Sequence, residues 1–308
     1  MGKNQKIMQN FSIKTIPTVD TAVLAALELF ESTKIPKIKI PYKRPLVVGS
    51  GNAIATGQII FKDYDAIFAT ESSFKSKLKN IKAIDGVVLL SARGEKHAPI
   101  IAKFAKSKNK KVILITNNKN ASANSFADQI YLFPKNREPY TYNTSTYMGP
   151  ILGFTKEDPK KIMQFINKST SKIKFPNFKK YKRFYLMIPE EFEGIIRLLN
   201  VKFIELFARQ VARDIETFEN TKHATTVVPS TNELFISFGK KNTTFGDPKH
   251  RLHIPLPKAA NYAAMMAIGY FVIGQIQKAH PPFFKKNIVT YMKRASKLFK
   301  KQMNPIVE

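Results

Sequence analysis

The sequence predicts an α/β protein built from doubly wound parallel sheets that helices flank. Short apolar runs of four to six residues recur, helical segments separate them, and the pattern occurs in both halves of the 308 residues. An apolar run without polar alternation needs burial on both faces, which is typical of parallel strands covered by helices. Ligands of such sheets bind beyond the carboxyl ends of the strands, near the point where the strand order reverses.

The first half contains five predicted strands. They are expected at residues 45–48, 64–69, 86–90, 111–116 and 129–133. Helices are expected at residues 18–34, 71–80, 96–106, 122–126 and about 144–154, and a glycine-rich turn after the first strand leads into a further helix. This alternation predicts one domain over residues 1–155, with an N-terminal helix before its sheet.

The second half repeats this alternation of strands and helices, without visible sequence identity to the first half. A lysine-rich connection is expected at 156–182, followed by a second domain at 183–308. Its strands are expected at 183–188, 226–229, 234–238 and 252–255. Its helices are expected at about 192–218, at 258–278 and, as a basic C-terminal helix, at 285–302.

The composition limits the compartment and the kind of site. The chain has no cysteine, which excludes disulfides and thiolate metal sites and fits a reducing compartment. Its start has no apolar signal core, and Asn261, Gly269, Gly274 and Gln275 interrupt its most apolar late stretch, 259–276. A bilayer span needs about 20 mostly apolar residues. We therefore expect a soluble, cytoplasmic protein with no membrane partner.

The net charge of +29 indicates an anionic partner. Nucleic acid is one candidate, but no zinc-finger spacing, RNA-recognition signature or helix-turn-helix pattern accompanies the lysines. The dense basic runs, at 108–111, 172–182 and 293–301, are typical of linkers or exposed helices. We therefore expect no specific nucleic-acid partner, and a small phosphorylated metabolite is the alternative that needs only a local pocket.

Four polar segments follow the first four predicted strands. They are Gly49–Asn52, Glu71–Ser73, Ser91–Lys96 and Thr116–Asn118. In a parallel sheet they share one edge, where glycines admit a ligand and where helix amides, hydroxyls and cations stabilise an anion. The chain has no GxGxxG motif and no acidic residue in the position that holds a ribose, so a dinucleotide is disfavoured.

Several of these segments resemble the sugar isomerase (SIS) domain family. VVGSGNA resembles the family's strand–GxS–helix opening, IFATESSFKSKL its next strand and helix, and LLSARGEKHAP its serine-rich phosphate loop. Of these, IFATESSFKSKL resembles the form found in the isomerase half of glucosamine-6-phosphate synthase. NREPYTYNTSTYMGPIL resembles the family's glutamate and Ser/Thr-rich helix start, and NVKFIELFARQVARDIETFENTKHATTVV resembles its helix with a catalytic glutamate and the segment that ends in Lys-His. The resemblance covers nearly the whole chain and implies two SIS domains in tandem.

The resemblance implies a phosphosugar pocket, formed in a homodimer, that needs no metal and no cofactor. Arg93 and Lys96 stand where the family has a second serine and a threonine, and Thr146 is an alternative to the two residues before it. Two cations in place of two hydroxyls can hold a phosphate, or they can indicate another ligand. The implied substrate-binding residues are Ser50, Gly51, Asn52, Ser91, Arg93, Lys96, Glu138, Thr144 and Ser145.

The implied catalytic residues are Glu205, as the carboxylate that moves a proton between adjacent carbons, and His223, which moves the proton of the ring oxygen. Asp214 and Glu216 are alternative carboxylates, because Glu205 and His223 lie farther apart than is usual in the family. The activity implied is isomerisation or deamination of a hexose or hexosamine 6-phosphate. A phosphoglucose or phosphomannose isomerase relative and a non-catalytic phosphosugar-binding protein are the alternatives. Glutamine hydrolysis is excluded, because the chain has no cysteine nucleophile.

Overall fold

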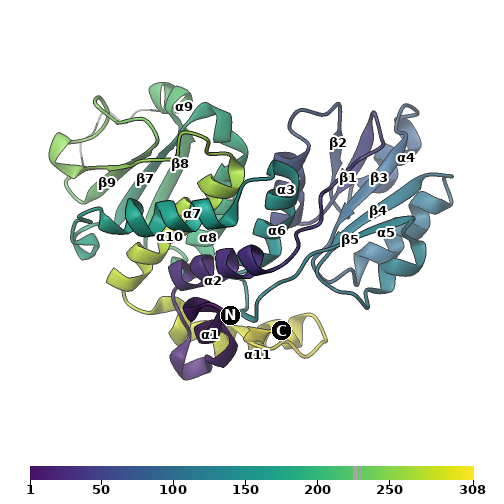
Figure 1. The fold of residues 1–308 in the computed structure, drawn as a ribbon, viewed down its shortest axis with the longest axis horizontal. Coiled ribbons are helices and arrows are strands. Elements are labelled where there is room, and N and C mark those ends of the chain that lie inside the picture. Colours follow the sequence, from purple (N-terminus) through teal and green to yellow (C-terminus); the bar gives the residue numbers. More distant parts are fainter. Residues whose placement is uncertain (225–227, 229) are drawn as a thin grey trace. The chain divides into compact units, whose positions relative to one another are not determined.

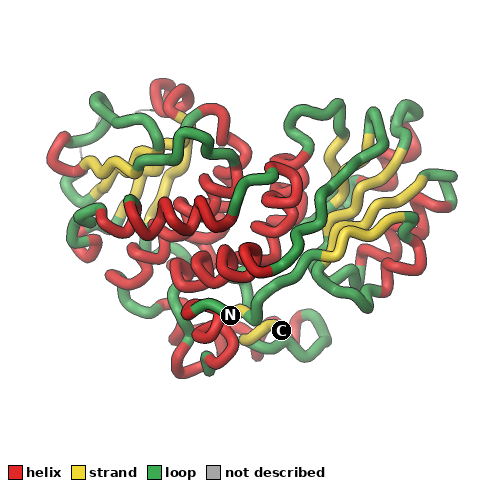
Figure 2. The backbone as a smooth tube through the Cα atoms, viewed as in Figure 1, coloured by secondary structure: helices red, strands yellow, loops and turns green. Residues whose placement is uncertain are grey.

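The structure is a computed structural model that describes residues 1–224, 228 and 230–308. The chain forms two compact units, each of which contains one parallel sheet (Figures 1 and 2). The five-stranded unit comprises Thr33–Lys135 and Ser145–Lys156. The four-stranded unit comprises Met1–Ser32, Asn136–Thr144 and Glu157–Glu308. The α/β class with helix-flanked parallel sheets, which the apolar runs predict, is confirmed.

The five-stranded sheet has the order β2-β1-β3-β4-β5, and all of its strands are parallel. The strand order reverses between β1 and β3, which makes the loops after these two strands the expected ligand site. The elements of this unit are β1 (Pro45–Val48), α3 (Asn52–Ile60), β2 (Ile67–Ala69), α4 (Phe74–Asn80), β3 (Gly86–Leu90), α5 (His97–Lys106), β4 (Lys111–Thr116), η2 (Ser122–Phe126), β5 (Gln129–Leu132) and α6 (Thr144–Thr155), whose first residue belongs to the four-stranded unit.

The central strands of this sheet are buried on both faces. Every residue of β1 and of β3 is buried. The cluster on one face includes Leu46 and Val48 with residues of α4 and α5, and the cluster on the other face includes Val47 with residues of α3 and α6. Figure 1 shows α4 and α5 on one side of the sheet and α3 and α6 on the other. The helices thereby leave the carboxyl ends of the strands to the loops.

The four-stranded sheet has the order β10-β9-β7-β8, and its strands are also parallel. Read in the opposite direction, the order is β8-β7-β9-β10, in which β7 to β10 correspond to β1 to β4 of the five-stranded sheet. The strand order of this sheet therefore reverses between β7 and β9. The elements of this unit are α1 (Lys3–Asn10), η1 (Ile13–Thr15), α2 (Val19–Ser32), β6 (Glu138–Pro139), α7 (Pro159–Lys168), η3 (Thr170–Lys172), η4 (Phe178–Lys180), β7 (Arg183–Ile188), η5 (Glu190–Ile195), α8 (Ile196–Phe207), β8 (Ala212–Thr217), α9 (Phe218–His223), β9 (Glu233–Phe238), η6 (Pro248–His250), β10 (Arg251–Ile254), α10 (Tyr262–Ala279), α11 (Phe283–Leu298) and β11 (Ile306–Val307).

The helix predicted over about 192–218 is correct for Ile196–Phe207 and wrong beyond Phe207. Helix α8 ends at Phe207, where Ala208 takes a positive φ of 52°, and β8 follows. Val211, Ile215 and Phe218 have the i, i+4, i+7 spacing of a helix, which explains the error. The strand is at the sheet edge and exposes polar residues, so it has no continuous apolar run. The strand predicted at 226–229 lies, except for Val228, outside the described residues.

The apolar helix α10 is a core helix of the four-stranded unit. It packs against α2 and α8. The Glu157 carboxylate accepts hydrogen bonds from the backbone N–H groups of Asn261 and Ala263 at 2.8 Å each, and this contact stabilises the start of the helix. No helix in the described part of the chain has the length and apolarity that a bilayer crossing requires.

Candidate functional site

The loop after β1 provides three of the predicted ligand residues. Gly51 has a φ of 55° just before α3, and no atom lies within 4 Å of the position that a Cβ would take. Asn52 begins the helix and is 8% exposed, and its buried Oδ1 atom has no hydrogen-bond partner. A buried polar atom without a partner costs free energy, unless a ligand or water bonds it. The loop therefore offers open space beside a hydrogen-bond acceptor.

Ser50, in the same loop, is bonded within the protein. Its hydroxyl donates to the carboxylate of Glu71, which follows β2. This hydrogen bond is the main reason why the pKa of the Glu71 carboxyl lies below its ordinary value. Glu71 is therefore negatively charged at neutral pH and holds the hydroxyl that the sequence assigns to a sugar phosphate. An entering phosphate has to replace that carboxylate as the acceptor.

The loop after β3 presents two cations on a fixed backbone. Arg93 and Lys96 are both exposed, and Lys96 directly precedes α5 with a φ of 55°. The Arg93 carbonyl accepts a hydrogen bond from Asn118 Nδ2 at 2.9 Å, and the Ser91 hydroxyl accepts one from the N–H of Gly94 at 3.2 Å. A guanidinium and an ammonium beside a helix start are a suitable arrangement for an anion.

Gly94 is required at its position in this loop. Its φ is 63°, and an added Cβ would lie 2.3 Å from the Cβ of Ala121. Its carbonyl accepts a hydrogen bond from the N–H of Ala123 at 3.1 Å. The loop after β3 is therefore packed against the loop after β4, which fixes the positions from which Arg93 and Lys96 extend.

The predicted catalytic carboxylate lies in the other unit, on α8. Glu205 Oε2 accepts a hydrogen bond from Lys202 Nζ at 2.8 Å, and the Lys202 side chain is 0% exposed. Burial raises the pKa of the Glu205 carboxyl above its ordinary value, and the charge of Lys202 opposes this effect. A carboxylate with a raised pKa is suited to accept and return protons near neutral pH.

Lys202 also joins α8 to the loop that carries Glu138 and Thr144, two of the predicted substrate-binding residues. Its Nζ donates to the carbonyl oxygens of Thr141 at 2.7 Å and of Tyr142 at 2.6 Å. In the same loop, the Glu138 carboxylate accepts a hydrogen bond from the N–H of Thr144 at 2.6 Å. The structure thus brings Glu205 and this loop onto one hydrogen-bonded cluster within the four-stranded unit.

Two features of this loop are typical of a ligand site. The hydroxyl oxygens of Thr141 and Thr144 are buried without a hydrogen-bond partner. Thr141 has a φ of 76°, which is strained for a β-branched residue. Strain and unpaired polar atoms concentrate at functional sites. Ser145, the next residue, is buried in α6, and Thr146 is 7% exposed.

Sequence reasoning missed Lys202, although the sequence carries a signal for it. Leu198, Leu199, Phe203 and Leu206 form the buried face of α8, and Lys202 lies on that face at helical spacing. A lysine is almost never fully buried unless it is paired. A glutamate three residues later on the same helix supplies the partner.

His223 is not joined to Glu205. It ends α9, its side chain is 79% exposed, and its Nε2 lies 3.8 Å from Glu219 Oε1. No hydrogen bond or ion pair connects it to Glu205 in the described part of the chain. The alternative carboxylates, Asp214 and Glu216, lie on the edge strand β8, where Asp214 is exposed and Glu216 is half-buried. Within the described ranges, no three His, Asp or Glu side chains cluster as a metal site requires.

Comparisons with known proteins support the family resemblance. The family model described as the SIS domain matches residues 61–151. The search of curated proteins gave no match. The C-terminal domain of glucosamine-fructose-6-phosphate aminotransferase from Francisella tularensis is similar in structure, with a TM-score of 0.59, 12% identity, and coverage of 87% of this chain and 94% of that one.

Two further solved structures are similar to this chain over most of its length. Glucosamine-6-phosphate deaminase from Thermotoga maritima has a TM-score of 0.58 and 14% identity, with coverage of 90% of this chain and 94% of that one. Tagatose-6-phosphate ketose/aldose isomerase from Escherichia coli has a TM-score of 0.54 and 12% identity, with coverage of 87% and 89%. At these identities the likeness shows a shared fold. The resemblance to the SIS domain is thereby confirmed for residues 61–151, and the fold is that of phosphosugar isomerase-like structures.

Proposed function

We propose that this protein binds a hexose or hexosamine 6-phosphate at the carboxyl edge of the five-stranded sheet and isomerises or deaminates it. The main observation behind this proposal is the chemistry of two loops. The loop after β1 has open space at Gly51 and an unpaired acceptor on Asn52, and the loop after β3 has two exposed cations. These loops lie where the strand order reverses, which is the expected position of a ligand in this fold. The names of the similar structures support the substrate class.

In this proposal Glu205 is the catalytic carboxylate. Isomerisation requires that the sugar ring opens, that a proton leaves the carbon beside the carbonyl and that a proton reaches the adjacent carbon, with no net change in atoms. The raised pKa of Glu205 supports this role, because the group can hold the proton between the two steps. His223 is proposed to move the proton of the ring oxygen, and its exposure is compatible with service to a neighbouring copy in a homodimer.

The second unit is proposed to be a second SIS domain. Its sheet has the same strand order as the first four strands of the five-stranded sheet. In this proposal the domains extend along the chain over 1–155 and 183–308, and 156–182 connects them, although Met1–Ser32 and Asn136–Thr144 of the first range pack within the four-stranded unit. The order of strands supports a duplication, whereas the sequence of this half carries weaker motifs.

A non-catalytic phosphosugar sensor is the second candidate. Two observations favour it: Arg93 and Lys96 replace the hydroxyls of the family's phosphate loop, and the Glu205 carboxylate is bound to Lys202. A sensor needs the anion site but no proton transfer. The two candidates therefore differ only in turnover.

A thermal-shift panel of sugar phosphates, followed by coupled turnover assays, tests the proposal. A ligand that binds only the native state raises the melting temperature. For the sugar that does so, Glu205→Gln should lower turnover by about 10²- to 10⁴-fold and leave the shift unchanged. Glu233→Gln, at a carboxyl whose pKa burial also raises, is the matched control and should leave turnover unchanged. Binding without turnover in the wild type would favour the sensor. A panel in which no sugar phosphate shifts the melting temperature would show that the proposed site is wrong.

A further inference from the structure

The carboxyl edge of the four-stranded sheet contains a hollow of about 310 Å³. Residues from the loops after all four strands line it: Pro189 to Phe192 follow β7, Phe218 follows β8, Gly239 and Lys240 follow β9, and Leu256 to Lys258 follow β10. The strand order reverses between β7 and β9, so the hollow lies at the position where this sheet type binds ligands. Its volume is at the lower end of the range for small-molecule sites.

Part of the lining of the hollow is apolar and is supported by packing. Phe192 is 5% exposed and packs edge-on against Tyr262, with 5.5 Å between the ring centroids. Leu256 and Pro189 border the space beside Gly239, where an added Cβ would lie 3.3 Å from Leu256. Gly239 has a φ of 68°, and its missing side chain keeps this space open. The hollow can therefore accept an apolar group of limited size.

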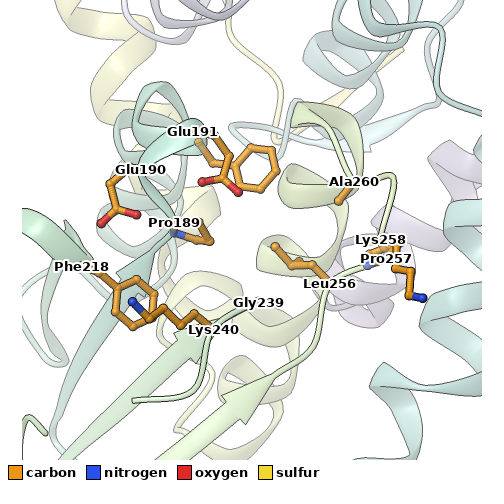
Figure 3. A pocket seen from close by; sticks show the side chains of 11 residues that line it. Pro189, Glu190, Glu191, Phe218, Gly239, Lys240, Leu256, Pro257, Lys258 and Ala260 are labelled. Atoms are coloured by element: carbon orange, nitrogen blue, oxygen red, sulfur yellow. The ribbon is translucent and has the colours of Figure 1, made fainter. Parts of the chain in front are cut away.

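The rim carries charges of both signs. In Figure 3, Glu190, Glu191 and Lys240 lie on one side of the hollow and Lys258 lies on the other. Glu190 already accepts a hydrogen bond from the backbone N–H of Glu219 at 2.9 Å, at the start of α9. The ammonium of Lys240 lies 5.6 Å from the centre of the Phe218 ring. Neither contact involves Glu191 or Lys258, which also line the hollow.

This arrangement disfavours a phosphate. The backbone N–H of Glu219, the second residue of α9, is already bonded to a glutamate, and the two carboxylates of the lining would repel a dianion. It also disfavours a simple cation, because Lys240 and Lys258 line the same hollow. Two carboxylates and two ammonium groups give the lining no net formal charge. A ligand that carries one charge of each sign matches such a lining on both sides.

We propose that this hollow binds a small zwitterion with an apolar side group, of which an aromatic or branched α-amino acid is the simplest form. The ligand's ammonium group bonds to Glu191, its carboxylate bonds to Lys258, and its side group lies between Phe192, Leu256 and Pro189. The site is separate from the proposed phosphosugar site, and the inference does not depend on that proposal.

Titrations with three matched probes test the assignment. Phenylalanine carries both charges, phenethylamine lacks the carboxylate and 3-phenylpropionate lacks the ammonium group. Binding is followed through the backbone amide signals of Glu191, Gly239 and Lys240 in the full-length protein. Phenylalanine should bind about fivefold more tightly than either analogue, because each analogue leaves one rim charge unmatched. Equal or tighter binding of an analogue, or no shift of these signals by any probe at millimolar concentration, would overturn the proposal.

Charge-neutral variants then test the orientation. Glu191→Gln should weaken phenylalanine and phenethylamine about fivefold and leave 3-phenylpropionate unchanged, whereas Lys258→Gln should weaken phenylalanine and 3-phenylpropionate and leave phenethylamine unchanged. Glu193→Gln and Lys249→Gln are the matched controls, because both residues are exposed and neither lines the hollow. Equal effects of the rim and control variants would indicate an unspecific charge effect and would refute the site.

Discussion

The two sheets share a strand order, but the loops at their carboxyl edges have different chemistry. At the five-stranded edge, the carboxylates of Glu71 and Glu95 are bonded to the serine hydroxyls of Ser50 and Ser122, and the loop after β3 exposes Arg93 and a lysine. At the four-stranded edge, two glutamates and two lysines line a hollow that also has apolar side chains. In this fold the strand order predicts where a ligand binds, and the different loops predict ligands of different charge at the two edges.

The two units also treat cations differently. Arg93 and Lys96 are exposed, whereas Lys202 of the four-stranded unit has no exposed side-chain surface. An exposed cation costs little, but a buried one needs hydrogen bonds that replace its hydration. Two carbonyl oxygens and Glu205 supply these bonds. Substitution of the buried lysine should therefore affect stability, whereas substitution of the exposed cations should affect the binding of an anion.

The largest expected effect is on stability, at the buried pair. Lys202→Met leaves Glu205 without its partner and two carbonyl oxygens without their donor. The free energy of unfolding should fall by about 3–5 kcal/mol, as measured by urea denaturation. The double variant Lys202→Met/Glu205→Gln, which carries no unpaired charge, should recover part of this loss. If it is no more stable than the single variant, the unpaired carboxylate is not the cause.

The stability that Lys202→Met loses should depend on pH, and the direction of this dependence can be predicted. The pKa of Glu205 is already raised by burial, and the removal of Lys202 takes away the charge that lowers it. A group with a raised folded-state pKa favours the native state below its unfolded pKa of 4.5, and this benefit is lost as the pH rises through the folded value. Lys202→Met should therefore be closer to the wild type near about pH 5 than near about pH 8. The opposite order would contradict the buried pair.

A smaller effect distinguishes two glycines that occupy comparable loops, after the third strand of each sheet. Gly94→Ala brings a Cβ to 2.3 Å from that of Ala121 in a left-handed backbone, so unfolding should become easier by about 3 kcal/mol. Gly239→Ala meets its first neighbour at 3.3 Å and should cost about 1–2 kcal/mol, mainly through the backbone. Equal melting temperatures of the two variants would show that the packing of the loop after β3 is looser than described.

The sequence predicts those features of the two sheets that depend on the local pattern of apolar residues. The runs at β1, β3, β4, β7 and β9 are buried and apolar, and each was expected within a residue of its observed bounds. The edge strand β8 was missed, because an exposed strand needs no apolar run and its few apolar residues have helical spacing. The bond between Ser50 and Glu71, the carbonyl partners of Lys202 and the mixed-charge hollow depend on how separate segments pack. No single segment contains that information.

At the five-stranded edge, Arg93→Gln and Lys96→Gln should each weaken binding of the sugar phosphate by about tenfold, as measured by calorimetry. The physical reason is the loss of one charge-assisted hydrogen bond to the phosphate. Lys258→Gln, at the other edge, removes the same charge and should leave this affinity unchanged. If all three variants weaken binding equally, the net charge of the protein, and not the loop after β3, attracts the ligand.

The smallest effect concerns the carboxylate that holds Ser50. The serine hydroxyl lowers the pKa of the Glu71 carboxyl further below neutral pH, so the ionised carboxylate should repel a phosphate and compete for the same donor. Glu71→Gln removes the charge and should strengthen binding of the sugar phosphate by about threefold. Asp63→Asn makes the same change of charge at an exposed position between α3 and β2, outside the polar loops, and is the control. A loss of affinity in Glu71→Gln alone would mean that this carboxylate bonds the sugar hydroxyls and does not oppose the phosphate, which would move the sugar ring toward β2.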